Sequence, residues 1–129
     1  MAKEHYVIVV ADDNALLNSF LSDLLLEEGY QVLCCFSGEE ALRIIRRVTP
    51  DVAILDMQME TRDAGLKVLE QLRQQPDTAR VSVIICSADV PFLDAKKKDI
   101  ATYGGEIVYK PFEIPHLLAT IEQILMATP

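Results

Sequence analysis

Five polar residues stand at the ends of short apolar runs, and their types could together carry out phosphate chemistry. They are Asp12 and Asp13 after the run at 6–11, Asp56 at the end of VAILD (52–56), Ser87 after the run at 81–86, and Lys110 after the run at 107–109. Short, wholly apolar runs are typical of strands in a parallel sheet covered by helices on both faces. Open α/β sheets place their sites at the carboxyl edge of such strands. The sequence therefore predicts three carboxylates, one hydroxyl and one ammonium group at one edge.

Three carboxylates at one edge repel one another unless a cation lies between them. Two carboxylates held about 4 Å apart repel by about 4 kcal/mol at an effective dielectric of about 20, and such repulsion raises carboxyl pKa values. Mg²⁺ with several bound waters suits a site with few carboxylates. Zinc is not expected, because no His or Cys joins this edge. We therefore expect Asp12, Asp13 and Asp56 to hold Mg²⁺.

An ionised Asp56 beside Mg²⁺ is a candidate nucleophile toward a phosphoryl group. The transition state of phosphoryl transfer spreads negative charge over three oxygens. Mg²⁺, the Lys110 ammonium and the Ser87 hydroxyl are the groups available to stabilise that charge. Each residue alone could be a helix cap, a turn residue or a surface charge, but their coincidence at strand ends favours a site.

The elements that position these residues alternate along the chain. Strands are predicted at 6–11, 31–36, 52–55, 81–86 and 107–109, and helices at 15–28, 37–48 with Ser37 as its cap, 65–74, 91–103 and 115–126. Five strands alternating with five helices indicate right-handed βαβ units around a parallel sheet. We expect residues 1–129 to form one domain.

Composition sets broad limits on function. The net charge of −8 argues against non-specific binding to nucleic acid. Of the three cysteines, Cys35 and Cys86 lie in or beside apolar runs and are expected in the core, which suits a reducing compartment. No apolar run approaches the roughly 18 residues of a membrane span, and no secretory signal is seen. A cytoplasmic protein is expected.

The chain resembles the receiver domain of two-component response regulators. The matching pieces are VVADDN (9–14), VAILDM (52–57), VIICSA (83–88) and YKPF (109–112), in this order and over essentially the whole chain. The resemblance implies the flavodoxin-like receiver fold, a doubly wound five-stranded parallel sheet of strand order 2-1-3-4-5. It also implies that Asp56 accepts a phosphoryl group from a histidine kinase or a histidine phosphotransfer protein, and that a conformational switch then controls an attached or separate output domain.

The resemblance further implies roles for single residues. Asp13 would ligate Mg²⁺ directly, Asp12 mainly through water, and Gln58 through its backbone carbonyl. Ser87 and Lys110 would bind the phosphoryl group, and the Lys110–Pro111 bond is expected to be cis. No catalysis is expected beyond weak self-phosphorylation and autodephosphorylation. The domain is expected to bind neither a membrane nor nucleic acid. A homodimer through the fourth and fifth helices is compatible with the family.

The chain departs from the family pattern at three places. Ile107 stands where the family usually has an aromatic residue whose rotation reports phosphorylation, and Tyr109 lies beside Lys110 instead. In the loop after Asp56, Glu60 replaces a common proline, and Gly65 comes one residue late, which indicates a one-residue insertion; Glu60 is expected to be a solvated loop residue. The segment from Ser87 to Lys110 is also one residue longer than in compact members.

Three other classes of protein compete with this interpretation. An aspartate-nucleophile phosphatase of the haloacid dehalogenase kind needs a second Asp two residues after the first, where this chain has Gln58. A flavodoxin-like cofactor binder needs a phosphate loop after the first strand, where Asp12 and Asp13 would repel a phosphate. A pseudo-receiver, which binds partners without phosphorylation, stays open because Ile107 replaces the aromatic residue. The leading interpretation is a phosphorylated receiver domain.

Overall fold

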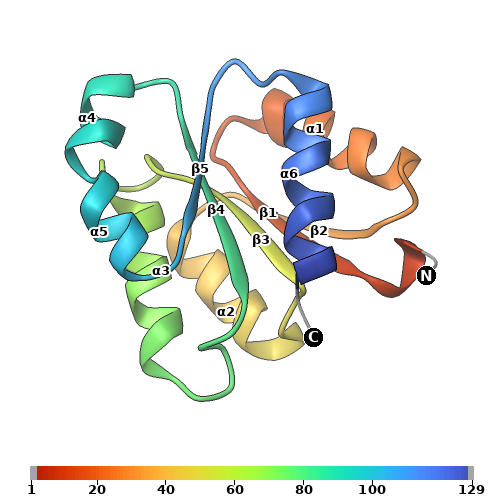
Figure 1. Ribbon diagram of the computed structural model, residues 1–129, viewed down its shortest axis with the longest axis horizontal. Helices are drawn as coiled ribbons and strands as arrows, with labels where there is room; N and C mark the ends of the chain where they lie inside the picture. The colour runs from red at the N-terminus through yellow and green to blue at the C-terminus, as the bar shows by residue number, and fades with distance from the viewer. Residues whose placement is uncertain (1–2, 128–129) are drawn as a thin grey trace.

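The computed structural model describes residues 3–127, which fold into a three-layer α/β structure (Figure 1). Five parallel strands form one sheet in the order β2-β1-β3-β4-β5, as predicted. The strands are β1 (Val7–Ala11), β2 (Gln31–Cys35), β3 (Val52–Asp56), β4 (Ser82–Ser87) and β5 (Glu106–Tyr109). Each predicted strand is thus confirmed to within one residue at either end.

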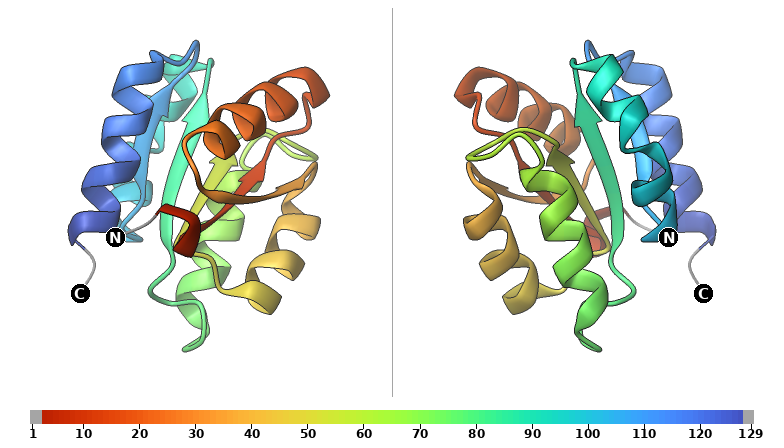
Figure 2. Two further views of the ribbon diagram at one scale, coloured as in Figure 1. Left: turned by 90° about the vertical axis from the view of Figure 1, so that its right-hand side faces the viewer. Right: turned by 90° about the vertical axis from the view of Figure 1, so that its left-hand side faces the viewer.

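Helices cover both faces of the sheet, and six α-helices lie within the described part of the chain. They are α1 (Ala15–Glu27), α2 (Gly38–Val48), α3 (Ala64–Gln74), α4 (Val90–Ala95), α5 (Lys97–Thr102) and α6 (Ile114–Ala127), after a short 3₁₀ turn, η1 (Lys3–His5). Helices α1 and α6 pack on one face, and α2, α3, α4 and α5 pack on the other (Figure 2, right). No helix among residues 3–127 is both long and apolar enough to cross a membrane.

The prediction of a single fourth helix at 91–103 is wrong. Two short helices, α4 and α5, meet at Lys96, whose φ and ψ of −99° and 4° leave the α-helical region. The Lys96 N–H is shared between the carbonyl oxygens of Phe92 and Leu93, each 3.1 Å away. Hydrophobic periodicity does not reveal this break, because the buried Leu93 and Ile100 are seven residues apart and stay on the same side.

Alternation along the strands builds two apolar cores, one on each face of the sheet. Ala53 and Leu55 of β3 join the core under α2 and α3, whereas Val52 and Ile54 join the core under α1 and α6. Every residue of β3 is buried, which explains why its sequence is apolar without interruption. Burial of each large aliphatic side chain contributes about 1.5–3 kcal/mol to stability.

The cysteines follow the same division between core and surface. Cys35 and Cys86 are buried, as predicted, and Cys34 is exposed. Burial raises the pKa of the Cys35 thiol to about 12, so this cysteine is a packing residue.

Local hydrogen bonds explain where the first two helices begin. Asn14 Oδ1 accepts from the Leu17 N–H at 3.1 Å at the start of α1. Ser37 Oγ accepts from the Glu40 N–H at 3.1 Å, as the capping-box spacing predicts. The Glu40 carboxylate, however, accepts from the Phe36 N–H at 2.9 Å and thereby ties the start of α2 to the end of β2.

Truncating one core residue tests this packing. Leu69 on α3 is fully buried, and Leu69→Ala is expected to lower the free energy of unfolding by about 2–4 kcal/mol, since it leaves a cavity. Leu16→Ala, at a leucine that is 85 % exposed, should change it by less than about 0.5 kcal/mol. Urea unfolding followed by circular dichroism measures both values, and equal losses would contradict the described core.

Candidate functional site

The carboxyl ends of β1 and β3 bring three carboxylates together. β1 pairs with β3 in a register that sets Ala11 opposite Leu55, so Asp12 lies beside Asp56. Oxygen atoms of Asp12, Asp13 and Asp56 all lie within 4.8 Å of one another. Asp12 and Asp56 are buried, at 4 % and 8 % exposure, whereas Asp13 is exposed to solvent. The predicted cluster is therefore present, with one of its three members open to the outside.

Lys110 supplies positive charge to this cluster from the end of β5. Its Nζ lies 2.7 Å from Asp12 Oδ2 and 3.4 Å from Asp56 Oδ1. The Lys110 N–H donates to the Ser87 carbonyl at 2.9 Å, which anchors the backbone at the end of β4. The Lys110–Pro111 bond is cis, as expected. One ammonium group is thus shared between two buried carboxylates.

Ser87 is the last residue of β4, and its hydroxyl lies in a hydrogen bond with the segment that follows. Cys86 pairs with Asp56 in the sheet, so Ser87 lies one residue beyond the neighbour of Asp56. Its side chain is buried, and its Oγ accepts from the Asp89 N–H at 3.0 Å. The structure therefore places Ser87 at the predicted edge, with its hydroxyl oxygen directed toward the start of α4.

The burial of Asp56 and its neighbours determines its protonation. Burial raises the pKa of Asp56 to about 6, and the charges of Asp12 and Asp13 act in the same direction, while Lys110 opposes them. Burial also lowers the pKa of Lys110, but its hydrogen bond to Asp12 and the attraction of both carboxylates outweigh this, so that the Lys110 pKa is raised. The lysine remains charged, whereas Asp56 carries an unfavourable charge at neutral pH.

Gln58, the predicted carbonyl ligand, lies in the loop after Asp56. Its side-chain Nε2 donates to Asp89 Oδ2 at 3.2 Å. The Met57 N–H donates to the Cys86 carbonyl at 2.8 Å, so the loop leaves β3 alongside β4. The metal-binding role of the Gln58 carbonyl stays a prediction.

Asp89 is a residue of this edge that the sequence reasoning missed. Its carboxylate accepts from the Phe92 N–H at 3.2 Å, from Gln58, and from Arg62 at 3.2 Å. The Arg62 guanidinium also lies 4.0 Å from the centre of the Phe92 ring. Asp89 thereby joins the loop after Asp56 to the start of α4. An Asp followed two residues later by Pro91 is an N-cap pattern that could have identified it.

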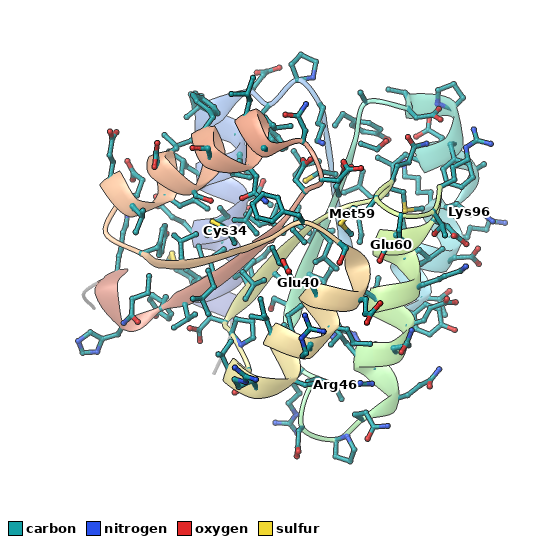
Figure 3. The ribbon with its side chains drawn as sticks, turned by 180° about the vertical axis from the view of Figure 1, so that it is seen from behind. Cys34, Glu40, Arg46, Met59, Glu60 and Lys96 are labelled. Carbon is teal, nitrogen blue, oxygen red and sulfur yellow. The ribbon has the colours of Figure 1, made fainter. Side chains whose placement is uncertain are left out.

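Glu60 is exposed in the loop, as expected, but its carboxylate also has partners that the sequence did not indicate. Its two carboxylate oxygens accept from the N–H groups of Gly38, at 2.7 Å, and Glu39, at 3.0 Å, at the start of α2. Figure 3 shows Glu60 beside this end of α2. Slight burial raises its pKa, but the backbone hydrogen bonds outweigh it, and the Glu60 pKa is lowered overall. The carboxylate is therefore held at a helix N-terminus, where negative charge is favoured.

Gly65 is required where the loop returns beneath the site. A Cβ atom at this position would lie 2.5 Å from the Asp56 carbonyl oxygen and 3.0 Å from Met57 Cα. The Gly65 N–H donates to the Met57 carbonyl at 2.9 Å. α3 begins at Ala64, one residue earlier than predicted.

At the two β5 positions singled out by the sequence, the side chains differ in burial. Ile107 is half-buried and packs against the core under α2 to α5. Tyr109 is 38 % exposed, and its hydroxyl donates to Asp94 Oδ1 of α4 at 2.6 Å. The aromatic residue therefore contacts α4 rather than the core.

The chain was also compared with protein families and with known proteins, and both comparisons find receiver domains or proteins of that family. The family model described as the response regulator receiver domain matches residues 8–122. The phosphate regulon transcriptional regulatory protein PhoB of Rhizobium meliloti (strain 1021) is 31 % identical over 118 residues, which cover 92 % of this chain and 51 % of PhoB. The chain thus spans about half the length of this relative.

Solved structures agree with the fold. The receiver domain of a Francisella response regulator is 28 % identical, with a TM-score of 0.83, over 96 % of this chain and 99 % of that chain. The receiver domain of the Pseudomonas aeruginosa sensor histidine kinase PA1611 has a TM-score of 0.82 at 22 % identity, over 95 % of this chain and 98 % of that chain. That second protein has a magnesium ion coordinated in its active site cleft.

The raised pKa of Asp56 predicts a pH-dependent effect of removing its charge. The folded pKa of about 6 lies above the ordinary value of 3.8, so the folded state binds the proton more strongly, and stability rises as pH falls through about 6. Without divalent ions, Asp56→Asn should raise the free energy of unfolding by about 1–2 kcal/mol near pH 7.5. The gain in the free energy of unfolding should shrink toward about pH 4.5, because Asp56 is then already protonated in the folded protein. Urea unfolding at both pH values measures it. Asp23→Asn, at an exposed carboxylate of α1, is the control; a gain independent of pH would contradict the assignment.

Proposed function

The chain belongs to the family of response regulator receiver domains, and on that premise we propose that Asp56 accepts a phosphoryl group from a phosphohistidine. The donor is a histidine kinase or a histidine phosphotransfer protein. The observation that carries the proposal is the buried Asp56 carboxylate, with Asp12 and Asp13 oxygens within 4.8 Å and Lys110 Nζ at 3.4 Å. A carboxylate so placed is both activated by its surroundings and faced by positive charge.

The donor set at this edge fits Mg²⁺. Three carboxylates with oxygens within 4.8 Å of one another provide hard oxygen ligands, and the exposed Asp13 leaves room for bound water. Asp13 and Asp56 would hold the ion directly, together with the Gln58 backbone carbonyl, and Asp12 would act mainly through water. When bound, the ion would counter the charge of the carboxylates and of the incoming phosphoryl oxygens.

The transfer is a displacement at phosphorus. An Asp56 carboxylate oxygen forms the new P–O bond while the P–N bond to the donor imidazole breaks, and the imidazole nitrogen leaves with the electron pair. The Lys110 ammonium, already 3.4 Å from Asp56, pairs with the developing phosphoryl charge. Apart from this self-phosphorylation and a slow autodephosphorylation, the domain carries out no catalysis.

The hydroxyl of Ser87 links the site to α4. It now accepts from the Asp89 N–H. If the side chain shifts in order to donate its proton to a phosphoryl oxygen, that hydrogen bond would be lost. Asp89 begins α4 and is tied to Gln58 and Arg62 of the loop, so a change at Ser87 shifts the contacts at the start of α4. The Tyr109–Asp94 hydrogen bond joins the other end of α4 to β5 and would respond to the same shift.

The output lies outside this domain. PhoB is described as a transcriptional regulatory protein, and the chain covers only 51 % of it. We expect an attached or separate output domain, which the shift at α4 would control, and no direct binding of nucleic acid by this domain. The cytoplasmic location stays a prediction from the sequence.

A pseudo-receiver is the second candidate, and one observation favours it. Ile107 packs into the core at the position where the family usually has a rotating aromatic residue. If the domain acts only by binding, it needs no phosphoryl group. Phosphorylation in solution separates the two candidates.

Incubation with a small phosphodonor and Mg²⁺ is expected to add one phosphoryl group to the protein. Asp56→Asn should abolish the addition, because the attacking oxygen is lost, and Asp23→Asn should leave it unchanged. Intact-mass spectrometry detects the adduct. If the unaltered protein gains no phosphoryl group, the receiver function proposed here is wrong and the pseudo-receiver is favoured.

Mg²⁺ is expected to bind weakly to the unphosphorylated protein. Asp13→Ala should weaken binding at least about tenfold, since it removes a direct ligand that faces solvent, whereas Asp23→Ala should leave it unchanged. Isothermal calorimetry or NMR titration measures the affinity. Equal affinities of the Asp13 variant and the unaltered protein would rule out the proposed metal site.

A further inference from the structure

The edge strand β2 lacks the features by which proteins usually protect a sheet edge. It has one neighbour in the sheet, β1, and its sequence QVLCC contains no charge and no proline. The opposite edge strand, β5, begins with the exposed Glu106 and is followed by Lys110. An uncharged apolar edge is a surface on which another strand can add.

The backbone pattern shows which groups of β2 are free to pair. The Gln31 N–H donates to the Tyr6 carbonyl at 3.1 Å, and the Cys35 carbonyl accepts from the Asp12 N–H at 3.2 Å, so these two residues face β1. In a parallel pair, alternate residues direct both backbone groups to the same side. Val32 and Cys34 therefore direct their N–H and C=O groups away from the sheet.

Apolar side chains flank this edge on both faces of the sheet. Leu33 is 40 % exposed and shares its face with Cys35, which lies in the core under α2. On the other face, Cys34 Sγ lies 2.8 Å from Ser22 Oγ of α1. Leu26, one turn after Ser22 and 53 % exposed, lies on the same side of α1. Figure 3 shows Cys34 on this open side of the sheet.

We propose that β2 pairs in an antiparallel manner with β2 of a second copy of this chain, which makes one continuous ten-stranded sheet. The free backbone groups select the register: Val32 lies opposite Cys34 of the second copy, and Cys34 opposite its Val32. Each such pair exchanges two N–H···O bonds. The two Leu33 side chains then face each other across the two-fold axis, which buries the exposed leucine at the centre of the interface.

The charges on α2 fit the same two-fold axis. Glu40 contacts the Phe36 N–H just after β2, so its side of α2 faces this edge. Ile44 and Arg47 follow at four and seven residues and lie on the same side. Among residues 3–127, Arg47 is in no ion pair. A two-fold axis makes the two α2 helices antiparallel. Glu40 of each copy then faces Arg47 of the other copy, so that opposite charges meet. A second copy is therefore the partner that this edge fits.

Leu33→Lys tests the apolar centre of the interface. Two ammonium groups at the axis should raise the dimer dissociation constant at least about tenfold. Sedimentation velocity over a concentration series measures it, and circular dichroism checks that the variant is folded. Leu16→Lys, at an exposed leucine on another side of α1, should leave the constant unchanged. Two results would overturn the proposal: a protein that is monomeric at every concentration, or a dimer whose dissociation constant Leu33→Lys does not raise. A dimer formed through α4, α5 and α6 would give the second result.

The charge pattern provides a second and sharper experiment. Glu40→Lys and Arg47→Glu should each weaken self-association, because each variant meets its own like charge across the axis. Mixed in equal amounts, the two variants regain complementary charges and should form a heterodimer, which a mass tag on one variant would reveal. If the mixture associates no better than either variant alone, the two-fold arrangement of α2 is wrong.

A disulfide can report the register directly. Residues opposite each other in a non-hydrogen-bonded antiparallel pair have Cα atoms about 4.5 Å apart, which a disulfide can span. On a Cys34→Ser background, Leu33→Cys should therefore cross-link to its second copy under mild oxidation. Leu16→Cys on the same background should not. Equal yields from both variants would contradict the proposed register.

Discussion

Mutual repulsion of Asp12, Asp13 and Asp56 is the constraint on which the carboxyl edge of the sheet depends. Their oxygens are held within 4.8 Å of one another, and a single ammonium group lies against two of them. Isolated loops would move such charges apart. Here Asp56 ends β3 and Asp12 directly follows β1, and the side chains of both strands are packed in the two cores. This packing stabilises the sheet and offsets the repulsion between the carboxylates. The three carboxylates are thus held close together because the strands that carry them are packed between two cores.

Sequence alone predicted the sheet and the cluster for one physical reason. A buried parallel strand needs apolar residues on both faces, so VAILD and its counterparts stand out, and the strand ends then follow from counting. Contacts between distant segments left no such signal. Glu60 binds amides 22 and 21 residues earlier in the chain, and Arg62 reaches Asp89, 27 residues later. The bend at Lys96 was missed because it preserves the phase of the apolar positions.

The departures from the family pattern lie in the loop before α3, in the segment from Ser87 to Lys110, and at Ile107 of β5. Arg62 stacks on Phe92, Gln58 and Arg62 share the Asp89 carboxylate, and Tyr109 bonds to Asp94. These contacts are polar or partly exposed, so each is worth little alone and several can exchange together. With Ile107 anchored in the core, a switch in this domain would depend on such exchanges and not on rotation of one ring.

The carboxylate of Glu60 also limits the motion of the loop that carries it. A loop lengthened by one residue has more conformations to lose when it is ordered. The Glu60 hydrogen bonds hold this loop near its middle. The two loop segments on either side of Glu60 are therefore short and have few backbone conformations available. If this loop exceeds the family pattern by one residue, as the sequence predicts, the Glu60 contacts hold the added length in place beside Asp56. Because Glu60 accepts from the amides of Gly38 and Glu39, the loop and the first turn of α2 are coupled, and their backbone amides should exchange hydrogen together.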